Sequence, residues 1–251
     1  MSSLIGIQSL VSKYLDDSKS IVDECVACAG ISSDFSEIYR ISLSADSVLA
    51  GLSSNVLKPS LNSARGIVLR VPMLSAIGQT SVAKAELRRF LELFFRTIYF
   101  TDHAVEWKEF QKQSGTGFAR DQHKPISFSA HRELGYYFDY AKELMEGEPS
   151  GLGVDSLDRL REINHRLNAV VHPGHLAITK GKAAPFEIPN SKLLREFSKL
   201  DRAVFSNSCI ILAAYRRTRF DVLNASSKAQ FDWLVGAKTR KMIRSGPFGL
   251  R

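Results

Sequence analysis

The sequence predicts an all-α protein, a bundle of helices without a sheet. Apolar residues recur at spacings of three and four through most of the chain, and helix-start and helix-stop residues flank these stretches. The chain has 251 residues, of which 44% are hydrophobic and 24% charged, as in ordinary soluble domains. We divide it into an N-terminal helical segment, residues 1–80, and a helical bundle, residues 81–251. The N-terminal segment is either part of that bundle or a separate arm.

The N-terminal segment contains two stretches with helical periodicity. Residues 1–30 are predicted to form one or two helices that end at Gly30. Residues 32–58 begin with polar residues suited to an N-cap and end before Pro59, which cannot donate a backbone hydrogen bond. We therefore expect a second helical unit there.

Residues 64–80 are ambiguous between a short strand and an irregular buried segment. Ile67, Val68, Leu69 and Val71 lie close together, and Pro72 interrupts the run. We expect this stretch to be a connection.

A strong amphipathic helix follows, starting at Thr80 or Ser81. Its apolar stripe is wide enough for a central helix of the bundle. The stripe contains Leu87, Phe90, Leu91, Phe94, Phe95, Ile98 and Tyr99. A polar, glycine-containing loop is predicted over 113–126, and another helix from Ser127 or Ser129 to Gly147.

The stretch with the densest reactive side chains is the predicted helix over residues 155–172. Asp155 or Ser156 is its expected N-cap, and His172-Pro173-Gly174 its end. Its apolar face consists of Leu157, Leu160, Ile163, Leu167 and Val171.

Five polar side chains lie beside that apolar face. Arg161, His165, Asn168 and His172 follow one helical rhythm and share a face. Arg166 lies six residues before His172, about 120° away around a regular helix. The two side chains therefore converge only if the helix end distorts or a second copy of the chain packs against it.

The Arg166-Leu-Asn-Ala-Val-Val-His172 stretch resembles the HEPN superfamily, helical proteins that include metal-independent ribonucleases of toxin–antitoxin, phage-defence and CRISPR systems. The family motif is an arginine, four to six residues and a histidine near a helix end. The residue after the motif arginine is often polar in the family, whereas here it is Leu167. The resemblance implies a HEPN-like bundle with extra N-terminal helices, and a homodimer whose two motifs form one cleft.

The resemblance also implies acid–base cleavage of RNA without a metal ion or another cofactor. His172 would move the proton and Arg166 would hold the phosphate, because a histidine titrates near neutral pH and a guanidinium is permanently charged. Asn168 would orient His172, while His165, His175 and Arg161 are secondary candidates for proton transfer or phosphate binding. An antitoxin or another subunit of a defence complex is an expected partner.

The charge distribution favours a nucleic acid as the partner. The formal net charge is +8, and residues 202–251 carry ten Lys or Arg residues but only two acids. A solvated helix face is the competing interpretation of this basic segment. The nucleic-acid-binding candidates within it are Arg216, Arg217, Arg219, Lys238, Arg240 and Lys241.

A structural interpretation competes with the catalytic one. His172 would then cap the C-terminal end of its helix, and Arg166 would pair with Glu162 one turn earlier. The corresponding function is a non-catalytic, helical nucleic-acid-binding or adaptor subunit of a defence or toxin–antitoxin complex.

The three cysteines favour a reducing compartment, and we expect a cytoplasmic protein without a membrane-spanning segment. Cys25 and Cys28 form a lone C-x-x-C pair without further zinc ligands nearby, so they are interpreted as part of a helix face. A zinc site from His165, His172 and His175 is disfavoured because the sequence has no H-E-x-x-H pattern around them.

Overall fold

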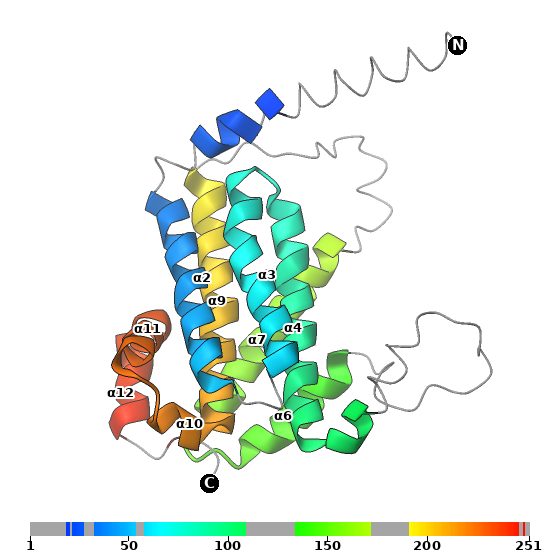
Figure 1. Ribbon diagram of the computed structural model, residues 1–251, viewed down its shortest axis with the longest axis vertical. Coiled ribbons are helices and arrows are strands. Elements are labelled where there is room, and N and C mark those ends of the chain that lie inside the picture. The colour runs from blue at the N-terminus through cyan, green and yellow to red at the C-terminus, as the bar shows by residue number, and fades with distance from the viewer. Residues whose placement is uncertain are drawn as a thin grey trace, which may run out of the picture.

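A computed structural model of the chain consists of helices joined by turns (Figure 1). The part of the chain that it describes contains no strand, which confirms the all-α prediction. It describes residues 19–20, 22–27, 33–53, 58–108, 134–171 and 191–245, and Phe248.

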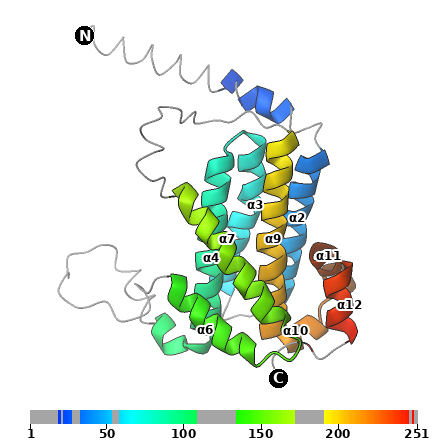
Figure 2. The same cartoon turned by 180° about the vertical axis from the view of Figure 1, so that it is seen from behind.

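The long helices form a closed ring (Figures 1 and 2). Each packs against the next along the chain, and the last packs against the first. The ring consists of α2 (Ser33–Leu52), α3 (Lys58–Ala76), α4 (Thr80–Asp102), α7 (Leu152–Val171) and α9 (Ser191–Tyr215). Neighbours run antiparallel except α9 and α2, which run in the same direction where the ring closes. Helices α2 and α3 therefore belong to the same bundle as the helices that follow them.

Buried aromatic side chains pack between the helices. Phe90 of α4 meets Phe205 of α9 edge to face, with ring centroids 5.0 Å apart. Phe95 lies 4.3 Å from the ring of Phe138, which belongs to α6 (Leu134–Glu146). All four rings are buried, and the burial of Phe90 and Phe95 agrees with the apolar stripe predicted for α4.

The expectation of a connection over 64–80 is wrong, because most of this stretch belongs to α3. Leu61, Ala64, Val68 and Val71 are fully buried at helical spacing. Pro72 lies inside the helix, where a proline costs about 3 kcal/mol. Burial of this apolar face, at about 1.5–3 kcal/mol for each large aliphatic side chain, outweighs that cost.

Helix α7 begins at Leu152, three residues before the expected cap at Asp155. The carboxylate of the buried Glu148 accepts hydrogen bonds from the backbone N–H groups of Ser150 and Gly153, at 2.9 and 3.2 Å. A carboxylate at this position satisfies N–H groups that have no partner within the helix. Glu148, which precedes the helix, therefore replaces the predicted N-cap.

The C-terminal segment contains three short helices, α10 (Arg217–Asp221), α11 (Ala225–Val235) and α12 (Ala237–Ser245). The Asn224 side chain caps α11 by accepting from the backbone N–H of Ser227 at 2.8 Å. Gly236 follows α11 with a φ of +82°, a conformation that L side chains rarely adopt and that suits a helix end.

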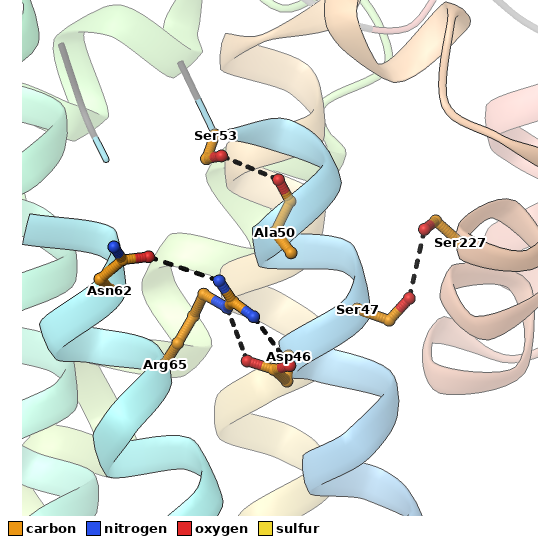
Figure 3. A network of polar contacts seen from close by, with 7 residues as sticks. All are labelled: Asp46, Ser47, Ala50, Ser53, Asn62, Arg65 and Ser227. Carbon is orange, nitrogen blue, oxygen red and sulfur yellow. Dashed lines mark hydrogen bonds and ion pairs between the residues drawn. The ribbon is translucent and has the colours of Figure 1, made fainter. Parts of the chain in front are cut away.

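Helix α2 makes polar contacts with its neighbours on two sides (Figure 3). On one side Asp46 pairs with Arg65 of α3, with Oδ1 and Nε 2.7 Å apart. On the other side the hydroxyls of Ser47 and Ser227 of α11 are 3.2 Å apart, and Ser44 donates to Gln230 at 2.7 Å. These contacts set the register of α3 and α11 along α2.

A carboxylate joins three helices at the lower end of the bundle in Figure 1. Asp102, the last residue of α4, accepts hydrogen bonds from the hydroxyls of Tyr140 of α6 and Tyr215 of α9, both at 2.6 Å. Burial, followed by these hydrogen bonds, raises the pKa of both tyrosines above its usual value. Among the described helices, none is both long enough and apolar enough to cross a bilayer.

Candidate functional site: a basic-rimmed groove beside Arg166

Four of the predicted site residues lie on α7. Arg161 is half-buried, Asn168 faces α4, and His165 and Arg166 are exposed. His172 and His175 lie outside the described residues, so the structure does not describe where the predicted proton-transfer group lies. The described half of the motif is Arg166, near the C-terminal end of α7.

Arg166 lies at the rim of a groove of about 510 Å³ between α4, α7 and α9. The apolar side chains of Ile163 and Leu167 line its wall from α7. The Arg166 side chain remains 69% exposed, and its ion pair with Glu162 confirms the predicted contact one turn earlier. The other lining residues are Lys84, Leu193, Glu196, Phe197, Lys199, Leu200 and Ala203.

Two lysines bring further positive charge to the groove. Lys84 comes from the first turns of α4 and Lys199 from α9. Neither forms an ion pair with the residues that the structure describes, whereas Arg166 is already paired with Glu162. Glu196 is the one acid among the lining residues. The groove therefore combines an apolar floor with a rim on which cations exceed acids.

Sequence reasoning missed Lys84, Lys199 and Glu196. They come from helices that are far apart in the sequence, and no spacing pattern connects them to Arg166. Only the packing of α4 and α9 beside α7 brings these charges to one place.

Two further site candidates on α7, Asn168 and Arg161, contact neighbouring helices. The side-chain oxygen of Asn168 accepts a hydrogen bond from Nε of Arg88, 2.5 Å away on α4. Arg161 pairs with Asp139 of α6 and lies over the ring of Phe138, 5.7 Å from its centroid. These contacts connect α7 to α4 and α6. That Asn168 orients His172 stays a prediction.

The basic residues of the C-terminal segment lie away from the groove. In Figure 1, α10 and α12 are at the lower end of the bundle, whereas Arg166 is near the opposite end of α7. Arg217 pairs with Asp221 and stacks over the rings of Phe220 and Phe248, with its guanidinium carbon 5.6 and 5.4 Å from their centroids. Of the predicted nucleic-acid-binding residues, Arg219 of α10 and Lys238, Arg240 and Lys241 of α12 are exposed, and Arg216 between α9 and α10 is half-buried.

No group of three or more histidine, cysteine or acidic side chains suited to a metal ion occurs in the described part of the chain. Cys25 and Cys209 are buried, and burial raises the pKa of the Cys209 thiol above its usual value. Cys28, the second cysteine of the C-x-x-C pair, lies outside the described residues.

Comparison of the chain with protein-family models, curated proteins and solved structures found no match. The groove, its charges and the basic C-terminal helices are therefore the basis for inferring what the protein does.

Proposed function

We propose that the protein binds RNA in the groove beside Arg166 and cleaves it without a metal ion. The observation that carries this proposal is the exposed Arg166 guanidinium at the rim of a groove that also carries Lys84 and Lys199. Three cations from three helices around one concave surface suit a phosphate chain, and the apolar floor suits a nucleobase.

The chemistry follows from the two residues of the motif. The ribose 2′-oxygen attacks the adjacent phosphorus as the bond from phosphorus to the 5′-oxygen breaks, which leaves a cyclic phosphate and a free 5′-hydroxyl. His172 takes the proton of the 2′-hydroxyl or gives one to the leaving 5′-oxygen. Arg166 stabilises the negative charge that builds on the phosphate oxygens. A second copy of the chain is the proposed means of bringing His172 close to Arg166.

RNA cleavage in EDTA tests this proposal. Wild-type protein is expected to cleave single-stranded RNA in EDTA, and His172→Ala and Arg166→Ala are each expected to slow cleavage by about 100-fold. Arg159→Ala is the control, because Arg159 is an exposed arginine of the same helix that does not line the groove. It should cleave like the wild type.

Two results would contradict the proposed ribonuclease. Cleavage that stops in EDTA would point to a metal-dependent contaminant or mechanism. Cleavage retained by His172→Ala would exclude the acid–base role of His172.

A non-catalytic nucleic-acid-binding function is a second candidate, carried by the exposed cations of α10 and α12. Arg219, Lys238 and Arg240 are exposed and far from the groove, so they do not depend on His172.

Salt-dependent RNA binding tests this second function. Replacing Arg219, Lys238 and Arg240 together by alanine is expected to reduce the slope of log affinity against log salt by roughly 2, at about 0.7 for each lost phosphate contact with single-stranded RNA. The control removes equal charge at exposed positions elsewhere: Arg89, Lys108 and Arg159. An equal reduction in both triple variants would show a general charge effect and contradict binding by α10 and α12.

A further inference from the structure

Four exposed apolar side chains lie together on the outer surface of α2 and α3. Tyr39 and Leu43 of α2 are 52% and 45% exposed, and Leu69 and Met73 of α3 are 42% and 67% exposed. Scattered exposed apolar residues are common on protein surfaces, but a contiguous cluster marks an interaction site. We refer to these four residues as the α2–α3 patch.

The ion pair between Asp46 and Arg65, drawn in Figure 3, sets the alignment of α2 with α3 beside the patch. The two helices run antiparallel, so residues before Asp46 lie beside residues after Arg65. At a rise of about 1.5 Å per residue, Leu43 and Leu69 lie about 4.5 and 6 Å from the ion pair along the axes of their helices. Along the same axes, Tyr39 and Met73 lie about 10.5 and 12 Å from it. The patch is therefore two matched apolar pairs that follow the seam between the helices.

Cations surround the patch. Arg65 lies at one end with its partner Asp46, and the two side chains are 32% and 19% exposed. Arg70, on the α4 side, is 52% exposed, whereas its partner Glu86 is 18% exposed. Arg40, on the α11 side, is exposed and lies over the ring of Trp233. The acids are less exposed than the arginines they pair with, so an approaching partner meets mainly positive charge.

Gly66 leaves an open surface on α3 beside the patch. It lies within α3, between Arg65 and the patch, and a Cβ atom built on it would meet nothing within 4 Å. Glycine weakens a helix interior, and here no internal contact requires it. A small residue on an open helix surface allows the backbone of a partner to come close.

We propose that the α2–α3 patch binds an amphipathic helix of another protein, with an apolar face flanked by acidic residues. The apolar face would lie along the seam between the two helices, as in other helix-in-groove complexes. The flanking acids would pair with Arg40, Arg65 and Arg70. A second copy of this chain fits less well, because a symmetric contact would place the same arginines of both copies against each other.

A pair of designed peptides tests this proposal. The first is an 18-residue helical peptide with leucine on one face and glutamate elsewhere, and the second has lysine in place of every glutamate. By fluorescence anisotropy, the glutamate peptide is expected to bind the full-length protein at least ten times more tightly than the lysine peptide. Leu43→Ser with Met73→Ser should weaken binding at least tenfold, and Gly66→Gln should weaken it without lowering the melting temperature.

Val105→Ser with Val222→Ser is the matched control, because these residues are 77% and 79% exposed and lie outside the patch. It should bind the glutamate peptide like the wild type. The proposal is overturned if the glutamate peptide does not bind, if both peptides bind equally, or if the patch variant binds as the control does. It is also overturned if the patch variant abolishes a dimer seen by light scattering, or binding to vesicles of anionic phospholipid, since the patch would then serve a second copy or a membrane.

Discussion

Arg202→Ala is expected to lower the free energy of unfolding by about 3 kcal/mol, because this side chain of α9 contacts both α11 and α2. Its guanidinium donates to the backbone carbonyls of Trp233 and Leu234 at 3.2 and 3.3 Å. It also pairs with Glu37 of α2 at 3.0 Å and lies 4.2 Å from the centroid of the Trp233 ring. The two carbonyls are in the last turn of α11, where a cation also stabilises the helix dipole.

A second arginine, Arg40, also lies over the Trp233 ring, with its guanidinium carbon 4.1 Å from the ring centroid. Urea unfolding followed by circular dichroism measures the stability change of Arg202→Ala. Limited proteolysis should show earlier cleavage around Gly236, because α11 is held less firmly.

Arg195→Ala is the control for this prediction. Arg195 lies on the same helix, is 65% exposed and pairs with Asp34 at 3.8 Å. Such exposed pairs contribute at most about 1 kcal/mol. An Arg202→Ala variant no less stable than Arg195→Ala would show that α11 is held mainly by its apolar contacts.

Asp201→Asn is expected to stabilise the protein at neutral pH by about 3 kcal/mol, an effect that disappears in acid. Asp201 is fully buried in α9, and neither carboxylate oxygen has a hydrogen-bond partner among the described residues. Burial raises the pKa of this carboxyl well above its usual value, and the nearby Arg202 opposes the shift.

The sign of the pH dependence follows from the raised pKa. Below the ordinary aspartate pKa of about 3.9 the group is protonated in both the folded and the unfolded chain, so it contributes no difference. As the pH rises from there towards the higher folded-state pKa, the unfolded chain loses the proton while the folded chain keeps it. This difference favours unfolding, so the stability contributed by this group falls as pH rises. Asparagine cannot ionise and has no such loss.

Urea unfolding of the wild type and Asp201→Asn at pH 4 and pH 7 measures this effect. The two proteins should have nearly equal stability at pH 4 and differ clearly at pH 7. Asp155→Asn, at an exposed position of α7, should differ from the wild type by less than about 0.5 kcal/mol at both pH values. A pH-independent difference for Asp201→Asn would mean that the carboxyl does not retain its proton on folding.

The sequence by itself was enough to predict the all-α class and the helices whose apolar period is strong. The aromatic stripe of α4 is buried as predicted, and so are Leu157, Leu160, Ile163 and Leu167 of the apolar face of α7, because spacings of three and four produce one apolar face on any helix. The pairing of Arg166 with Glu162 was also predictable, because residues four apart on a helix are neighbours.

Local sequence signals gave wrong helix boundaries where another contact in the structure competed with them. Pro72 led to a predicted connection within α3, and Asp155 to a misplaced start of α7. In α3 the burial of an apolar face outweighed the cost of the proline, and at α7 the buried Glu148 supplied the cap. The first outcome depends on side chains that meet only after the chain has folded, whereas the second is a local contact, because Glu148 lies five residues before Gly153.

The surroundings of Arg166 were decided by the tertiary structure. Packing of α4, α7 and α9 brings Lys84 and Lys199 to the groove, and the antiparallel pairing of α2 with α3 aligns the four residues of the α2–α3 patch. The same packing separates α10 and α12 from Arg166, although the sequence suggests nucleic-acid contacts for both. The physical reason is that helical periodicity reports which face of one helix is buried, whereas only the packing of helices decides which faces meet.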